Sequence, residues 1–243
     1  DVGLSTHFSE AAVPQLAGVA RALAEGRRPE VPYTLDDMAD DVVGLMDALG
    51  FADAHVAGIS MGGMIVQQVA IRHPERVRSL TSIMSTSGAR HLPRARFKVL
   101  LRMGKAPKNT DPDTVARHMA RTMRMIGSPV YGRSLADWTS EIRRNVVRSY
   151  YPPGVRRQML AVLTAPSRAD LLGAISCPTL IIHGDADRLV PIQQAHWIMP
   201  KFKEAGIEAE LLVMPGKDHG WEPEPEELKK FGDWFDKHLL GDN

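Results

Sequence analysis

The chain has 243 residues and a mass of 26.8 kDa, with 30 basic and 29 acidic residues and a net charge of +1. This length suits one large domain or two small ones, and a content of 44% hydrophobic and 24% charged residues excludes global disorder. A single cysteine, Cys177, excludes a disulfide framework, and the sequence contains no run of 18 apolar residues that could span a membrane.

The charge is unevenly distributed along the chain. Residues 90–168 carry 17 Lys plus Arg against 4 Asp plus Glu, a charge of +13, so the remainder carries 13 against 25, a charge of −12. A shift of this kind predicts a separate subdomain. The basic segment has three interpretations: packing on an acidic body, attraction of acidic substrates or surfaces, and nucleic-acid binding. The last is disfavoured because its arginines are scattered without an aromatic stacking pattern.

In chain order, the first strong pattern is a helix over residues 34–49. Thr34 is suited to cap its N-terminus, and Gly50 to end it. The apolar residues of its predicted buried stripe recur with a period of 3.6 and are Leu35, Met38, Val42, Leu45, Met46 and Leu49. A strand suited to burial is predicted over 54–59, followed by a helix over 61–73 and a second strand over 77–84.

The basic segment predicts only helices, over about 94–103, 112–126, 134–150 and 155–163. Strands return at 178–183 and 210–214, alternating with helices at 192–205 and 226–240, the last with Leu228, Phe231, Phe235 and Leu239 on one face. Strand–helix alternation on both sides of a helical insert predicts an α/β fold with a mostly parallel sheet flanked by helices. Residues 1–88 and 171–243 would form this core, and residues 89–170 an all-helical lid.

One motif carries chemistry: Gly58-Ile59-Ser60-Met61-Gly62, followed by Gly63. It lies between a predicted strand and a predicted helix, as a nucleophile elbow requires. Its glycines would let neighbouring backbone pass, and the hydroxyl of Ser60 would be presented at a helix N-terminus. A glycine-rich turn that only packs closely is the alternative.

A serine nucleophile needs a base, and the base needs an orienting carboxylate. Of nine histidines, His219 is the best candidate because it lies in a loop just after a strand, whereas His55 and His183 lie within strands. Either Asp185 or Asp187 could orient it from spacing alone. Asp218 is a poor candidate because neighbouring side chains diverge. The order Ser, Asp, His differs from that of the two serine-protease classes.

These motifs resemble the α/β-hydrolase superfamily over nearly the whole chain, with Gly58–Gly63, His183–Pro191 and Gly216–Trp221 as the matching pieces. The first two-thirds is most similar to methylesterase-like and carboxylesterase members. The tail from Gly184 is similar to small esterases of the dienelactone-hydrolase and peptidase-like branch. The resemblance implies that Asp187 is the catalytic acid and Asp185 structural.

The resemblance also implies that the family fold begins before Asp1, with strands and an oxyanion loop that precede this point. The N–H of Met61 would supply one oxyanion donor, and the missing loop the second; loss of one donor costs about 100- to 1,000-fold in turnover. A fragment, a partner that supplies the missing part, or a rebuilt core would each account for this, and of the three we expect a fragment. Without the earlier strands, the strand over 54–59 would form a sheet edge.

The expected activity is cleavage of small to medium, mainly apolar carboxylic esters by Ser60, His219 and Asp187, with Trp138 and Trp221 as candidate substrate-binding residues. A thioesterase, lactonase or perhydrolase would share these residues, and a catalytically impaired fragment or ligand-binding scaffold would share the fold. No cofactor, metal or nucleic-acid partner is expected, and a homo-oligomer stays open. The absence of a signal peptide in Asp1–Ala12 predicts a cytoplasmic location.

Overall fold

The structure, a computed structural model, describes residues 3–128 and 133–239. Within these ranges the sheet has four parallel strands. Its strands are β1 (Ala54–Ile59), β2 (Val77–Ile83), β3 (Thr179–Gly184) and β4 (Ala209–Met214), and they lie in the order β1-β2-β3-β4. In the register, Ser82 lies opposite Gly58 on one side and Ile181 on the other. All three pairings are parallel, which confirms the predicted α/β class.

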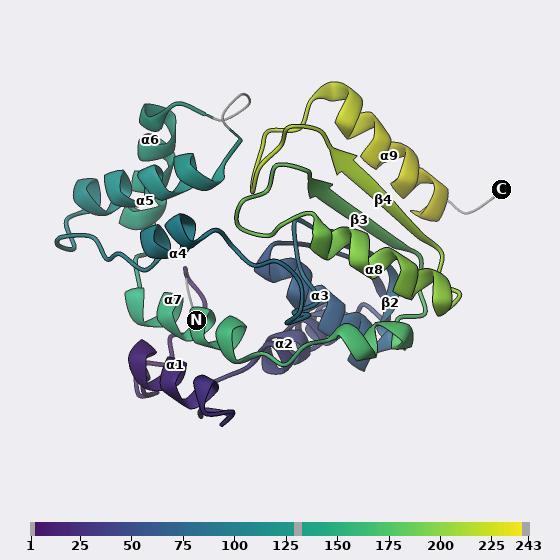
Figure 1. The fold of residues 1–243 in the computed structure, drawn as a ribbon, viewed down its shortest axis with the longest axis horizontal. Helices are drawn as coiled ribbons and strands as arrows, with labels where there is room; N and C mark the ends of the chain where they lie inside the picture. Colours follow the sequence, from purple (N-terminus) through teal and green to yellow (C-terminus); the bar gives the residue numbers. More distant parts are fainter. Residues whose placement is uncertain (1–2, 129–132, 240–243) are drawn as a thin grey trace.

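Helices cover both faces of the sheet (Figure 1). Successive side chains of a strand point to opposite faces. On β3, whose residues are all buried, Ile181 packs into a cluster with α2 (Leu35–Ala48), α3 (Met61–Arg72) and α8 (Gln193–Glu204). Leu180 and Ile182 pack on the other face, against Trp234 of α9 (Pro225–Leu239). A strand buried on both faces explains the continuous apolar run Leu180-Ile181-Ile182 in the sequence.

The helix α2 begins where the sequence predicts. The hydroxyl of Thr34 accepts the N–H of Asp37, and the Asp37 carboxylate accepts the N–H of Thr34, which completes a capping box. The buried stripe, however, differs from the predicted one. Its four members are Leu35, Ala39, Val43 and Met46, whereas the predicted apolar residues Leu45 and Leu49 are each 60% exposed. The small side chain of Ala39 lets α2 approach the core.

In the described residues between β2 and β3, the α-helices are α4 (Phe97–Met103), α5 (Pro112–Ile126), α6 (Leu135–Arg148) and α7 (Pro152–Thr164). We call residues 89–170, which contain them, the helical insertion. Helices α5 and α6 share an apolar cluster of their own, with Val115, Ala116, Ala120, Ile142 and Val146 at its centre. Helix α4 begins three residues later than predicted and α7 three residues earlier, with Pro152 in its first turn.

The two connections between the helical insertion and the sheet lie together. The backbone N–H of Arg168, at the end of the insertion, donates to the Ser87 carbonyl at its start, at 2.8 Å. The guanidinium of Arg168 donates to the Thr86 carbonyl at 2.7 Å and to Gln67 of α3 at 3.2 Å. Desolvation of this buried group lowers the pKa of Arg168 to about 10. A short 3₁₀ helix, Ala169–Ala174, then leads back to β3.

The segment before α2 forms a helix that the sequence analysis missed, α1 (Leu16–Ala24). It lies beside α7 (Figure 1). The hydroxyl of Ser149 donates to the Gly3 carbonyl, and Arg157 donates to the Ala11 carbonyl at 2.7 Å. These early residues therefore contact the helical insertion as well as the core to which the sequence assigns them. The division at residues 88 and 170 stays a prediction.

The last helix, α9, packs through a residue that the sequence analysis did not select. Trp234 is 6% exposed, and Phe231 and Phe235 pack around it, but Leu228 is 54% exposed. The side chain of Leu239 lies outside the described residues. None of the helices in the described ranges is long and apolar enough to cross a membrane.

Candidate active site

Ser60 occupies a strained turn between β1 and α3. Its backbone has φ 54° and ψ −114°, in the positive-φ region that residues other than glycine rarely adopt. Two hydrogen bonds hold this conformation: the N–H of Ser60 donates to the Ile83 carbonyl at 2.9 Å, and the Ser85 hydroxyl donates to the Ser60 carbonyl at 2.8 Å. The turn thus presents the Ser60 hydroxyl beside the first residue of α3, at the carboxyl end of the sheet.

Glycines around Ser60 are required by close contact. A Cβ at Gly58 would lie 2.2 Å from the Gly62 carbonyl oxygen, and a Cβ at Gly63 would lie 2.5 Å from the Ser85 Cβ. A Cβ at Gly62 would meet nothing within 4 Å. The tight turn therefore excludes side chains at Gly58 and Gly63, whereas Gly62 contributes its backbone to the contact.

The structure brings Ser60, His219 and Asp187 together from three different loops. The imidazole Nε2 of His219 lies 2.9 Å from the Ser60 Oγ, and its Nδ1 lies 2.8 Å from the Asp187 Oδ2. Since a carboxylate accepts hydrogen bonds, Nδ1 carries the proton and Nε2 is free to accept the Ser60 proton. His219 is 8% and Asp187 6% exposed. This arrangement can deprotonate the serine hydroxyl.

Asp187 is held by its own loop after β3. Its Oδ1 accepts the backbone N–H groups of Leu189 and Val190, at 2.8 and 2.7 Å. His183, fully buried at the end of β3, donates from Nε2 to the Val190 carbonyl at 2.7 Å. Burial lowers the pKa of His183, so the ring beside Asp187 is neutral near pH 7.

Asp185 holds the same loop against the loop that carries His219. Its Oδ1 accepts the N–H of Gly216 at 2.6 Å, and the N–H of Ala186 donates to the Lys217 carbonyl at 3.0 Å. Gly184 makes this approach feasible, since a Cβ there would lie 2.3 Å from the Lys217 oxygen. The two loops therefore meet as one unit behind the histidine.

Asp218 has partners that the sequence analysis did not foresee. Its carboxylate bonds backbone groups and Arg188, whereas the imidazole ring bonds Asp187. Its Oδ1 accepts the backbone N–H groups of Arg188 and His219, each at 2.8 Å, and its Oδ2 pairs with the Arg188 guanidinium. The only signal in the sequence for the Arg188–Asp218 pair is that Arg188 follows Asp187 and Asp218 precedes His219.

The remaining candidates lie in different surroundings. Trp138 packs in the cluster of α5 and α6, with the Arg133 guanidinium 5.6 Å from its ring. Trp221 packs against the cluster of β3, β4 and α9. Met61 is the first residue of α3, where a backbone N–H has no partner within the helix. The substrate-binding roles of the two tryptophans stay predictions.

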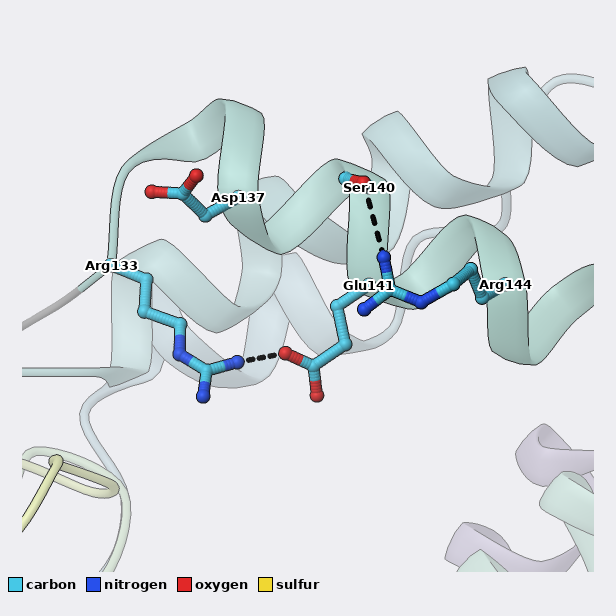
Figure 2. A pocket seen from close by; sticks show the side chains of 5 residues that line it. All are labelled: Arg133, Asp137, Ser140, Glu141 and Arg144. Carbon is cyan, nitrogen blue, oxygen red and sulfur yellow. Dashed lines mark hydrogen bonds and ion pairs between the residues drawn. The ribbon is translucent and has the colours of Figure 1, made fainter.

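A surface pocket of about 320 Å³ is lined by side chains of α6 and by Arg133, which lies just before it (Figure 2). Its charged groups are occupied locally: Arg133 pairs with Glu141, and Arg144 donates to the Ser140 hydroxyl at 3.3 Å. Asp137, which also lines it, caps α6. None of Ser60, Asp187 and His219 lines this pocket. Within residues 3–128 and 133–239, no group of three or more His, Cys, Asp or Glu side chains is arranged to hold a metal ion.

The helical insertion contacts the core through an ion pair and through buried hydrogen bonds. Arg133 pairs with Glu222 at 3.5 Å, and both side chains are exposed. Two of the buried arginines of the insertion, Arg157 and Arg168, donate to backbone carbonyls of the core. The three interpretations of the +13 segment stay predictions.

Fold and site together define an α/β protein with a serine, a histidine and an aspartate in hydrogen-bonding order at the carboxyl edge of a parallel sheet. Residues 20–220 match the family described as alpha/beta hydrolase fold. The chain belongs to this family.

Curated relatives and solved structures of this fold cover most of the chain. It is 29% identical over 211 residues to a 2-hydroxymuconate semialdehyde hydrolase of Pseudomonas sp. (strain CF600), covering 76% of this chain and 68% of that protein. It is 29% identical over 172 residues to a pimeloyl-[acyl-carrier protein] methyl ester esterase of Chromobacterium violaceum, covering 69% and 65%. The chain thus spans about two thirds of the length of these relatives.

A solved structure supports the fold alone. The enol-lactonase from Burkholderia xenovorans LB400 superposes with a TM-score of 0.61 at 19% identity, over 88% of this chain and 76% of that one. At this identity the likeness describes how the chain folds and leaves the chemistry to the site.

Proposed function

We propose that this protein is a serine hydrolase that cleaves carboxylic esters through an acyl-enzyme. The observation that carries the proposal is the continuous hydrogen-bonding path from Ser60 Oγ through His219 to Asp187, with distances of 2.9 and 2.8 Å. The path begins at a residue whose strained backbone places its hydroxyl at a helix N-terminus. A structural serine would not require this strain.

In the first step, Ser60 Oγ attacks the ester carbonyl carbon while His219 Nε2 takes the hydroxyl proton. Asp187 keeps the proton on Nδ1 and stabilises the imidazolium that forms. The N–H of Met61, with the α3 dipole behind it, donates to the developing oxyanion. Collapse of the tetrahedral intermediate breaks the ester C–O bond, and the alcohol leaves with the proton from His219.

In the second step, water replaces the alcohol. His219 removes a proton from the water, whose oxygen attacks the acyl carbonyl. The bond to Ser60 Oγ then breaks, the serine recovers its proton, and the carboxylic acid leaves. Every proton passes through His219 Nε2, so no group outside these three residues is needed for proton transfer.

The helical insertion is proposed to act as a lid, and its apolar side chains favour a mainly apolar acyl group. The apolar side chains of the insertion include Met103, Met123 and Met125. Methionine is flexible and can adapt to acyl groups of irregular shape. The relative named as a methyl ester esterase is consistent with an ester as the substrate. A thioesterase or lactonase would use the same residues. A cytoplasmic location stays part of this proposal.

Replacement of the nucleophile tests the proposal. Ser60→Ala should abolish hydrolysis of p-nitrophenyl acetate and labelling by a fluorophosphonate. Ser140→Ala, which alters an α6 hydroxyl that accepts from Arg144, should still be labelled and should keep its turnover. Full turnover by Ser60→Ala would refute the mechanism. A panel of oxygen esters, thioesters and lactones with graded acyl chains would then assign the substrate class.

A further inference from the structure

Ser128, the last residue described before position 129, holds the loop of His219 from both sides. Its hydroxyl accepts the N–H of Asp218 at 2.7 Å, and its own N–H donates to the Gly220 carbonyl at 3.0 Å. Asp218 and Gly220 are the two neighbours of His219 in the chain. Ser128 is 1% exposed and follows the carboxyl end of α5, so a residue of the helical insertion brackets the histidine.

Arg188 adds a second connection between the same elements. Its guanidinium donates from Nη2 to the Met125 carbonyl of α5 at 2.6 Å and pairs through Nε with Asp218, whose side chain is 2% exposed. Its carbonyl accepts the N–H of Arg96, just before α4, at 3.0 Å. Arg188 also follows Asp187 directly in sequence. One side chain thus joins the insertion to the loops of both His219 and Asp187.

The buried Asp218 carboxylate fixes the geometry of the contact between the two catalytic loops. A carboxylate accepts several hydrogen bonds at defined angles, and bonds to a charged group are stronger than those between neutral groups. The Asp218 carboxylate accepts hydrogen bonds from the Arg188 N–H, the Arg188 Nε and the His219 N–H. The position of this carboxylate therefore fixes the backbone of His219, from which the imidazole projects. Loss of the insertion would leave this carboxylate without the Ser128 bond that orients its own backbone.

We propose that Ser128 and the Arg188–Asp218 pair are positioning residues that make the orientation of His219 depend on docking of the helical insertion. The inference rests on the proposed serine-hydrolase function. The insertion then does more than cover the substrate, because the general base is aligned only while α5 is seated on the two catalytic loops. Positional errors of about 1 Å at reacting groups cost on the order of 100-fold in rate, so a partial loss of these bonds is measurable.

The test compares Ser128→Ala with a matched control, Ser167→Ala. Ser167 also lies in the insertion, and its hydroxyl also accepts a backbone N–H, that of Ala169 at 3.2 Å, but this bond lies at the connection to β3. Ser128→Ala should lower kcat for p-nitrophenyl acetate about 10-fold or more with little change in KM, as for loss of a transition-state interaction. Ser167→Ala should keep the parental kcat.

A second readout does not depend on catalysis. The Nδ1 proton of His219, bonded to Asp187, should give a low-field proton resonance, assigned by its loss in His219→Gln. Ser128→Ala and Asp218→Asn should weaken or shift this resonance, and Ser167→Ala should leave it in place. Because Ser128 and Asp218 act on one loop, the double variant should lose less than the sum of the single losses in activation free energy.

The outcomes separate the two proposals. Parental kcat and an unchanged resonance in Ser128→Ala and Asp218→Asn would overturn the positioning role while leaving the hydrolase mechanism intact. Equal losses in Ser128→Ala and Ser167→Ala would also overturn it, since general loosening of the insertion would explain both. If Ser60→Ala retains turnover, the hydrolase mechanism fails, and the resonance still decides whether the insertion orients His219.

Discussion

Replacing Gly184 with alanine tests whether the two loops behind His219 must touch. The new Cβ would lie 2.3 Å from the Lys217 carbonyl oxygen and 2.8 Å from the Lys217 carbonyl carbon. Carbon and oxygen atoms in contact prefer separations of about 3.5 Å, so the loops would have to part by about 1 Å. The backbone of Gly184 does not have a positive φ, which leaves space as the only obstacle.

The displacement has two expected consequences. Overpacking of this kind costs about 1–3 kcal/mol in unfolding free energy. A 1 Å shift between Asp187 and His219 should lower kcat by about 100-fold. Urea denaturation and p-nitrophenyl acetate hydrolysis measure the two effects. Gly173→Ala is the control, because its Cβ would meet the Ala205 Cβ at an ordinary 3.7 Å. Parental stability and turnover in Gly184→Ala would refute the reasoning.

Three further predictions follow from individual hydrogen bonds. Asp187→Asn should lower kcat by about 10⁴-fold, because an amide favours the wrong imidazole tautomer of His219. Asp185→Asn keeps an acceptor for the Gly216 N–H and should stay active; equal losses in the two variants would contradict the assignment of Asp187 as the residue that orients His219. Burial lowers the pKa of His183 in the folded chain, so the unfolded chain binds this proton more readily and the unfolding free energy should fall as the pH decreases below about 6.5. His183→Asn should reduce this slope between about pH 5 and 6.5 in urea titrations, and an unchanged slope would exclude the burial effect. Thr34→Ala should cost about 1 kcal/mol in the same assay through loss of the α2 cap, and a neutral effect would show that the capping box contributes nothing.

The long elements could be predicted because their signals are local. Thr34 marked the start of α2 and Gly50 its end, and Asp111 accepts the N–H of Thr114 as a cap of α5 should. Helix α1 carries weaker signals, since Gln15 makes no side-chain cap, although apolar residues at 16, 19, 20 and 23 do repeat with a helical period.

Which apolar residue becomes buried was harder to predict. Leu45 and Leu228 satisfy the helical period yet are exposed, whereas Ala39 and Trp234 are buried. The helical period of the apolar residues predicts the buried face of a helix only to within about one residue. The elements that pack against the helix decide how it is rotated about its axis, and therefore which residues are buried. Side-chain size matters at that stage, because Ala39 fits where two helices approach closely.

The sequence alone determined which residues could do the chemistry. Gly58 admits the close backbone contact with Gly62 that a tight strand–turn–helix needs, and that constraint is local. The order of Ser60, Asp187 and His219 along the chain was likewise visible without coordinates. The nearby carboxylates were not resolved by spacing, since Asp185 and Asp187 differ by two residues in one loop.

Only the tertiary structure decided how those carboxylates are used. Asp187 meets the imidazole, Asp185 meets Gly216, and Asp218 meets Arg188, because the loops after β3 and β4 fold against each other. The same packing places Ser128 of the helical insertion on both neighbours of His219. Such partners lie between 30 and 92 residues apart in the chain, and no local pattern records a contact that only the assembled fold creates.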